Sequence, residues 1–225
     1  DLITRPAARD MVRIRAAVNR SIRENFFRRD YIELETPMLQ MIHGGAAARP
    51  FTTHMNALDT DLYLRIATEI YLKRAVVGGV DRVFEMNRNF RNEGMDSSHS
   101  PEFTSLEAYE AYSDYNGMAE LTRDLIQQAA RDAFDLSEGE EIVRLADGTE
   151  YDLSGQWDRI DLYGSTSEAL GEEVTVETPR ETLVKYAERI GLEVDDYAVS
   201  GKIVEDIFEE LVASKLWAPT FVYDF

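Results

Sequence analysis

Two segments of the chain alternate hydrophobic and polar side chains with a period of two, which is the pattern of a half-buried β-strand. In 82–91 the apolar positions include Phe84, Met86 and Phe90, and 103–109 shows a similar alternation. A polar stretch separates the two segments. The pattern therefore predicts two strands that are joined by a polar loop, with one face of the pair unusually polar.

The polar face of this predicted strand pair carries residue types that suit a nucleotide and an amine. The second strand should place Leu106 and Ala108 in the core. The other face then gathers Arg91, Glu93, His99, Phe103 and Glu107. A guanidinium group matches phosphate oxygens, an aromatic ring can cover a base, and a carboxylate can pair with an ammonium group. A solvated hairpin with surface ion pairs fits the alternation equally well, because such pairs are common and weak.

Steps of three and four between apolar residues predict amphipathic helices elsewhere in the chain. The first helix should begin near Pro6, since apolar residues recur at these steps from Met11 to Phe26. Further helices are expected at 70–77, 116–133, 180–190 and 201–214. Strands are expected at 157–163 and 219–225, and a hairpin should join 142–145 to 151–153. Helices and strands together predict the α+β class.

The composition indicates one folded domain that does not cross a membrane. With 225 residues, of which 44% are hydrophobic, the chain can bury one sizeable core, so 1–225 is expected to be a single domain. No apolar run approaches the ~20 residues that a membrane helix needs, and no signal peptide begins the chain. The absence of cysteine excludes disulfides and thiolate metal sites and fits a cytoplasmic protein.

The net charge and the positions of the histidines argue against two further functions, general RNA binding and zinc binding. A net charge of −19 argues against a general RNA-binding domain, because an acidic surface repels a polyanion. Basic residues cluster in 5–29, a run that we interpret as a solvated helix face. The three histidines are scattered, so no zinc site is expected, and His43 and His54 are interpreted as ordinary loop or surface residues.

The order of residues in 90–109 resembles motif 2 of class II aminoacyl-tRNA synthetases, in the form found in lysyl-tRNA synthetases. The resemblance rests on Phe-Arg-Asn-Glu-Gly at 90–94 and on His-Ser-Pro-Glu-Phe-Thr-Ser-Leu-Glu at 99–107. Segment 31–39, which follows a long helix and contains a proline, looks like motif 1, the family's homodimer interface. Segments 43–51 and 62–74 are also similar to lysyl-tRNA synthetases. The likeness covers most of the chain.

The resemblance implies how ATP would be bound. Arg91 would contact both the α-phosphate and the lysine carboxylate, as the main catalytic residue. Glu93, His99 and Ser100 would hold the nucleotide, and Phe103 would stack on the adenine. At Ser100 the chain departs from most family members, which have Asn at this position, where the adenine is held.

The resemblance also implies a lysine pocket. Gly45 and Ala67 would border the backbone of the amino acid, and Glu69 would receive its α-ammonium group. Glu107, together with Tyr109, would receive the ε-ammonium group. By themselves, a glycine pair at 44–45 is more often a turn, and a glutamate at 69 is more often a charge at the start of a helix.

The expected protein is thus a class II synthetase catalytic domain, an antiparallel sheet flanked by helices, truncated at both ends. An anticodon-binding OB-fold is expected before it, and motif 3 with the Mg²⁺ ligands after it, so no metal ligand is expected in this chain. The implied reaction is the ATP-dependent activation of L-lysine to lysyl-adenylate, followed by transfer to tRNA(Lys). The parent protein would be a cytoplasmic homodimer that does not bind membranes, and the truncated chain would be impaired.

Three alternatives stay open. The first is an enzyme that lysylates a protein side chain, although that family has Ser where this chain has Ala67. The second is a synthetase for aspartate or asparagine, which Glu69 and Glu107 disfavour, because two carboxylates would surround an acidic or neutral side chain. The third is a non-catalytic, synthetase-like module for binding or dimerisation.

Overall fold

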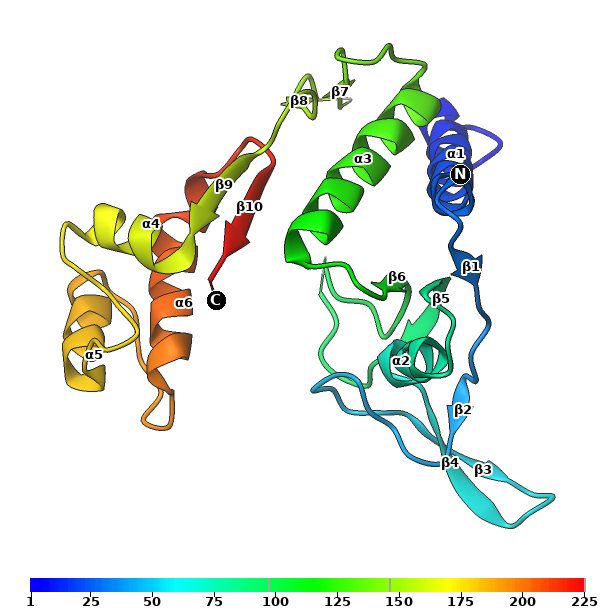
Figure 1. Cartoon of the computed structure of the whole chain (residues 1–225), viewed down its shortest axis with the longest axis horizontal. Helices are drawn as coiled ribbons and strands as arrows, with labels where there is room; N and C mark the ends of the chain where they lie inside the picture. Colours follow the sequence, from blue (N-terminus) through cyan, green and yellow to red (C-terminus); the bar gives the residue numbers. More distant parts are fainter. Residues whose placement is uncertain (97, 146, 225) are drawn as a thin grey trace. The chain divides into compact units, whose positions relative to one another are not determined.

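The computed structural model describes residues 1–96, 98–145 and 147–224 (Figure 1). The chain divides into two compact units, one of Asn19–Met118 and the other of Asp1–Val18 with Ala119–Phe225. The first helix, α1 (Pro6–Arg28), runs from one unit into the other and begins where the sequence predicts. That 1–225 forms a single domain stays a prediction.

The unit of Asn19–Met118 is built on the predicted strand pair. Strand β5 (Arg82–Phe90) pairs with β6 (Glu102–Glu110) in antiparallel orientation along its whole length, from Arg82 opposite Glu110 to Phe90 opposite Glu102. A short strand, β1 (Ile32–Glu33), adds to the other side of β5 in parallel. The two predicted strands and the α+β class are confirmed. The strand expected in 31–39 is shorter than predicted, since it ends at Glu33 and does not reach Pro37.

Helices and loops cover both faces of β5. On one face, the ring of Phe26 from α1 stacks on Phe84 with 4.4 Å between centroids. The opposite face carries Glu85 and Asn89, whose side chains are each 1% exposed. The prediction of a half-buried strand is therefore wrong for β5, since it is the central strand of the order β1-β5-β6 and is covered on both sides.

The prediction that Leu106 faces the core is also wrong. Leu106 lies opposite Met86 in the register, on the same face as Phe84, but it is 37% exposed. Strand β6 is at the edge of the described sheet, so its middle residues have fewer neighbours than those of β5. The polar side of β6 is instead partly covered, because its residues Phe103, Ser105, Glu107 and Tyr109 are each only intermediate in exposure.

A second sheet and a helix flank the strand pair in the same unit. Strands β2 (Leu39–Gln40), β4 (Thr60–Leu64) and β3 (Thr52–Met55) form an antiparallel sheet in that order. Helix α2 (Glu69–Val77) follows β4 after a short turn and begins at Glu69, next to the predicted 70–77. The β3–β4 hairpin was not among the predicted elements.

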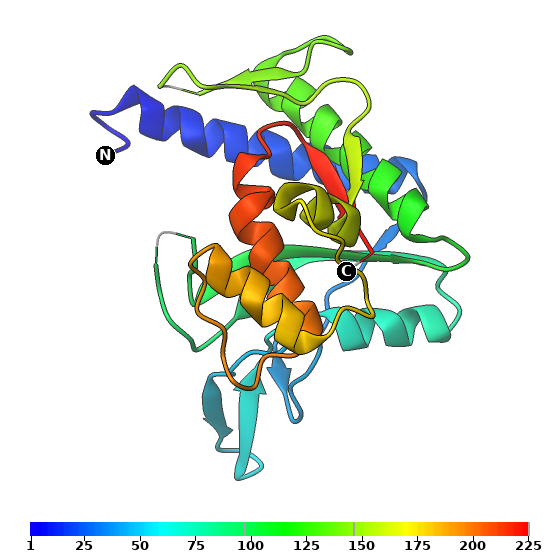
Figure 2. The same ribbon diagram turned by 90° about the vertical axis from the view of Figure 1, so that its left-hand side faces the viewer.

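The other unit contains the remaining elements, which largely follow the predicted periodicity. They are α3 (Tyr115–Phe134), which begins just before this unit, β7 (Ile142–Arg144), β8 (Glu150–Asp152), β9 (Asp158–Asp161), α4 (Leu162–Leu170), α5 (Arg180–Arg189), α6 (Ser200–Leu211), a 3₁₀ turn (Ala213–Lys215) and β10 (Thr220–Tyr223). The predicted hairpin is β7 with β8, which pair antiparallel. Strands β9 and β10 pair in parallel and lie side by side (Figure 2). The predicted strand at 219–225 includes Phe225, which lies outside the described residues.

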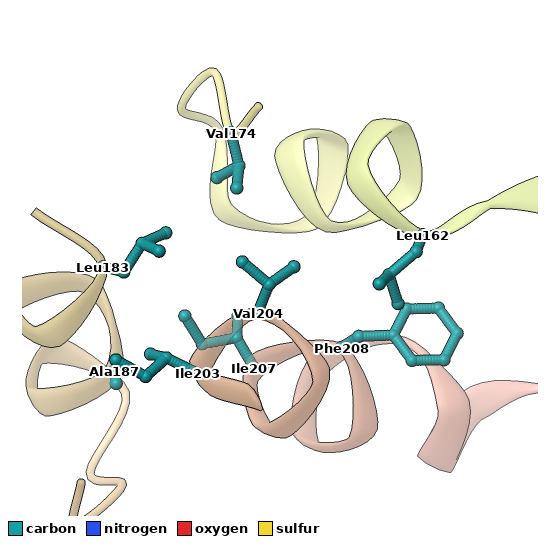
Figure 3. Packing of buried hydrophobic residues seen from close by; sticks show 8 residues of the cluster. All are labelled: Leu162, Val174, Leu183, Ala187, Ile203, Val204, Ile207 and Phe208. Atoms are coloured by element: carbon teal, nitrogen blue, oxygen red, sulfur yellow. The ribbon is translucent and has the colours of Figure 1, made fainter. Parts of the chain in front are cut away.

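Helices α4, α5 and α6 pack around a hydrophobic cluster (Figure 3). The apolar stripe of α6 supplies Ile203, Ile207 and Phe208, all buried, which confirms that this stripe serves packing. Helix α4 was not predicted, because Gly164 and the Ser and Thr residues around it are poor helix formers. Asp161 stabilises its start by accepting a hydrogen bond from the Gly164 N–H. Within the described part of the chain, we find no helix with the length and apolarity of a membrane span.

Candidate active site

Glu107 and Tyr109 lie on the same side of β6, with the carboxylate of Glu107 fixed from two directions. The Thr68 N–H donates a hydrogen bond to Glu107 Oε1 at 3.1 Å, and the Tyr109 hydroxyl donates one to Glu107 Oε2 at 3.1 Å. Burial raises the pKa of Tyr109, and the charges of Glu107 and Glu69 raise it further. Tyr109 therefore stays protonated at neutral pH and continues to donate to the carboxylate.

Glu69, the first residue of α2, is the second carboxylate beside Tyr109. Its Oε1 atom forms an ion pair with Nζ of Lys73, one turn later in the helix, at 2.6 Å. The same Nζ lies 5.6 Å from the centroid of the Tyr109 ring. The two glutamates predicted to bind lysine are thus both linked to Tyr109, Glu107 by a hydrogen bond and Glu69 through the ammonium group of Lys73.

Gly45 packs against the start of this helix so closely that no other residue fits without displacement. Its φ is +88°, a left-handed conformation that glycine adopts without strain. A Cβ at this position would be 3.1 Å from the Cβ atoms of both Ala67 and Glu69. The structure thus brings together Gly45, Ala67 and Glu69, as expected for a small-residue border beside a carboxylate.

Arg91 and Phe103 form the other end of the candidate site. The guanidinium carbon of Arg91 lies 5.1 Å from the centroid of the Phe103 ring. Arg91 Nε donates a long hydrogen bond of 3.4 Å to the carbonyl oxygen of Ile66. Among the described residues, the two terminal nitrogens of this guanidinium have no hydrogen-bond partner. They are therefore available to an anionic ligand.

Within the described part of the chain, no hydrogen bond, ion pair or ring contact joins Glu93 or His99 to Arg91 or Phe103. Glu93 accepts a hydrogen bond from the Arg49 N–H at 3.3 Å, which ties the loop after β2 to the end of β5. His99 bonds through Nδ1 to Asp96 at 2.8 Å and is exposed. Backbone N–H donation from Ser98 and the bond from His99 hold the pKa of the Asp96 carboxyl well below its usual range. The structure does not bring all five residues of the predicted polar face together, and the roles of Glu93, His99 and the exposed Ser100 stay predictions.

Sequence reasoning missed a buried ion pair that lies next to Glu107 in the strand pair. Arg65 is 0% exposed and Glu85 is 1% exposed, and Arg65 Nη1 lies 2.7 Å from Glu85 Oε1. The carboxylate of Glu85 also accepts hydrogen bonds from the backbone N–H and the hydroxyl of Thr36. The available signal was the position of Glu85 on the polar face, with Glu107 directly opposite it in the register.

Arg65 connects this ion pair to the residues of the candidate site. Its carbonyl oxygen accepts a hydrogen bond from the Phe90 N–H at 3.0 Å, and its backbone N–H donates to Met38. The next residues along the chain are Ile66, which contacts Arg91, and Thr68, which contacts Glu107. The buried ion pair thus fixes segment 65–68, which forms hydrogen bonds both to Arg91 and to Glu107.

The comparison with protein families decides what kind of chain this is. The sequence profile described as tRNA synthetases class II (D, K and N) matches residues 1–225. This chain belongs to the class II tRNA synthetase family. The β5–β6 pair, with Arg91 at the end of β5 and Glu107 in β6, is therefore part of a class II synthetase domain.

Relatives of this class II synthetase chain are closely similar over its whole length. Two proteins named lysine–tRNA ligase, from Kineococcus radiotolerans and Mycolicibacterium gilvum, are 57% and 58% identical to it over 226 and 227 residues. A protein of Mycolicibacterium vanbaalenii named lysylphosphatidylglycerol biosynthesis bifunctional protein LysX is 48% identical over 229 residues. All of this chain is covered in each case, but it spans only 44% of the two ligases and 20% of the bifunctional protein.

Proposed function

We propose that the protein to which this chain belongs activates L-lysine with ATP and transfers the lysyl group to tRNA(Lys). The single observation that carries the proposal is the carboxylate of Glu107, held by the Thr68 N–H and the Tyr109 hydroxyl within a class II synthetase domain. The negative charge of this half-buried carboxylate suits the ε-ammonium group of lysine. The names of the two similar ligases support the same amino acid.

The rest of the amino acid would be bound at the other residues of the site. Glu69 receives the α-ammonium group, and the small residues Gly45 and Ala67, which pack closely beside it, border the backbone of the ligand. Arg91 receives the carboxylate with its terminal nitrogens. Two carboxylates and one guanidinium thus match the two ammonium groups and the one carboxylate of lysine, whereas aspartate or asparagine would leave Glu107 without a cation.

ATP would be bound where Arg91 and Phe103 meet. The ring of Phe103 stacks on the adenine, and Arg91 contacts the α-phosphate. A carboxylate oxygen of lysine attacks the α-phosphorus, the bond to the bridging oxygen breaks, and pyrophosphate leaves. The carboxylate is already ionised at neutral pH, so no general base is required, and the protein acts by positioning the reactants and by neutralising phosphate charge.

In the second step, a hydroxyl at the 3′ end of the tRNA attacks the carbonyl carbon of lysyl-adenylate. The ester bond to the tRNA forms as the bond to the phosphate oxygen breaks, and AMP leaves. Class II synthetases are expected to use Mg²⁺ with ATP. Within 1–96, 98–145 and 147–224, however, no group of three or more His, Asp or Glu side chains is arranged to hold a metal ion, so we assign no step to one.

We also propose that the protein is a two-fold homodimer through the motif 1 region, Met11 to Pro37. Phe27 and Ile32 in this region are large apolar residues that are about half exposed, at 51% and 52%. A stable interface would bury more than ~1,200 Å². Sedimentation of the full-length protein at micromolar concentration should give a dimer, and a monomer would count against this interface.

The function is tested by ATP–pyrophosphate exchange with the full-length protein. Exchange should depend on L-lysine. Norleucine lacks the ε-ammonium group, and its kcat/KM should be lower by ~10⁴-fold, because a site built around a polar substrate group discriminates strongly against an analogue that lacks this group. The Glu107→Gln variant should raise the KM for lysine far more than the KM for ATP. Comparable activation of norleucine by the unaltered protein would overturn the assignment.

A second candidate is that the chain is part of a larger bifunctional protein similar to the LysX protein of Mycolicibacterium vanbaalenii. The observation that favours it is the 48% identity over all of this chain. The chain would then make up about one fifth of the whole protein, as it does of that relative, and not 44%, as it does of the ligases. The length of the reading frame around the chain separates the two candidates.

A further inference from the structure

Lys73 is a lysine of the chain itself that lies at the site proposed to bind the amino acid lysine. It lies in α2, and its Nζ is 2.6 Å from Glu69 Oε1 and 5.6 Å from the centroid of the Tyr109 ring. Both partners belong to the residues proposed to hold lysine. The chain therefore presents its own ammonium group to the carboxylate and the ring that a bound lysine would need.

We propose that Lys73 competes with the α-ammonium group of the substrate for Glu69 and thereby sets the affinity for lysine. This inference rests on the proposed function and adds an affinity-determining residue to it. Two ammonium groups at one carboxylate repel each other, so the substrate binds fully only when the Lys73 side chain moves away. That side chain is 55% exposed, and its flexible stem lets the ammonium group move into water.

The alternative is an ordinary ion pair within a helix. A glutamate followed four residues later by a lysine stabilises an isolated helix slightly, and such pairs are common. The contact with Tyr109 distinguishes Lys73 from such a pair, because the ring belongs to another element, β6, and its hydroxyl donates to Glu107. If Lys73 only supported Glu69, its removal would weaken lysine binding. Competition predicts the opposite sign.

The chain offers a matched control in α6. Lys202 pairs with Asp206, four residues later, at 2.9 Å and with Glu205 at 3.2 Å, and its side chain is 50% exposed. This pair involves no residue of the candidate site. The Lys202→Met variant therefore removes a lysine charge of similar exposure from an ion pair within a helix, and it should leave lysine binding unchanged.

The experiment measures the KM for lysine in ATP–pyrophosphate exchange with the full-length protein and its variants. Lys73→Met removes the charge but keeps the length of the side chain, and it should lower the KM for lysine by about two- to fivefold, the effect of a partly exposed ion pair. The kcat and the KM for ATP should not change. Lys73→Arg, which keeps the charge, should not lower the KM for lysine, and Lys202→Met should match the unaltered protein.

A second ligand locates the competition at the α-ammonium group. The lysine analogue 6-aminohexanoate has the carboxylate and the ε-ammonium group of lysine but no α-ammonium group. Its inhibition constant should therefore be the same for Lys73→Met as for the unaltered protein. An unchanged or raised KM for lysine in Lys73→Met would overturn the inference while the proposed function stands. If the unaltered protein showed no lysine-dependent exchange, the proposed function and the inference would both fail.

Discussion

The central strand β5 and the helix α6 each bury side chains in the core of their own unit, but they bury different kinds of side chains. The fully buried residues of α6 are Ile203, Val204, Ile207 and Phe208. Those of β5 include Glu85 and Asn89 beside apolar residues, and Glu85 is paired with the buried Arg65. Burying a charge pair gives no more stability than apolar packing of similar volume. Stability alone therefore does not explain why β5 carries charges.

The position of the buried charges relates them to the candidate site. Glu85 lies directly opposite Glu107, and like charges that face each other across a strand pair are destabilising. The guanidinium of Arg65 neutralises Glu85, so that the strand pair can carry Glu107 on the same face. In α6 no such demand exists, and apolar side chains fill the core. The comparison teaches that the buried charge of β5 is related to the charge that the neighbouring strand presents in the candidate site.

The largest effect is expected from breaking the buried pair. The Arg65→Met variant leaves Glu85 buried without its cation, and the free energy of unfolding of the full-length protein should fall by about 3–5 kcal/mol. Chemical denaturation monitored by circular dichroism measures this change. The double variant Arg65→Met with Glu85→Met removes both charges and should recover most of the loss. If the double variant is as unstable as the single one, the charge pair is not the cause.

The second effect separates chemistry from stability at the same strand. Arg91 follows β5, and among the described residues its terminal nitrogens have no hydrogen-bond partner, so its removal costs the fold little. Arg91→Ala should reduce the rate of lysine-dependent exchange by ~10²–10³-fold. This corresponds to roughly 3–4 kcal/mol of activation free energy, the usual cost of removing a hydrogen-bond donor to the transition state. The free energy of unfolding should change by less than ~0.5 kcal/mol. Near-normal exchange in this variant would remove Arg91 from the reaction.

These two variants also mark what sequence reasoning could and could not reach. Arg91 and Glu107 were predicted as site residues because the period-two pattern places them on one face and because the residues around them resemble motif 2. Arg65 was missed because it lies 20 residues before Glu85, and only the packing of Arg65 and its neighbours against the central strand brings the two together. The same packing buries Glu85, where alternation alone predicted an open polar face.

Helices show the same division between local and non-local information. The ends of α6 and α3 were predicted within a few residues, because their apolar stripes repeat over three or more turns. Helix α4 was missed, since its Gly164 and hydroxyl side chains favour a loop and its stability comes from Leu162 packing on α6. The contact of Lys73 with Tyr109 likewise depends on two elements that no local pattern relates.

A smaller effect is expected from Tyr109, an uncharged residue of the proposed lysine pocket. Tyr109→Phe removes the hydroxyl that donates to Glu107 but keeps the ring. A hydrogen bond to a charged group is worth about 1.5–3 kcal/mol, so the KM for lysine should rise by roughly tenfold or more, with little change in the KM for ATP. Steady-state exchange kinetics measure both constants. Equal increases in both would mean that the hydroxyl supports the whole site and not the lysine pocket.

The smallest effect is expected from a change in the apolar core of α6, which tests the comparison with β5 from the other side. Ile207 is fully buried in α6, and Ile207→Val deletes one methylene group from the cluster of α4, α5 and α6. The full-length protein should lose about 0.5–1.5 kcal/mol of unfolding free energy, because the neighbours only partly fill the space that is left. The KM for lysine should be unchanged, since the cluster contains no residue of the candidate site. A changed KM for lysine at equal stability would show that the helical cluster influences the amino-acid pocket, and the division between packing and chemistry that distinguishes α6 from β5 would then be wrong.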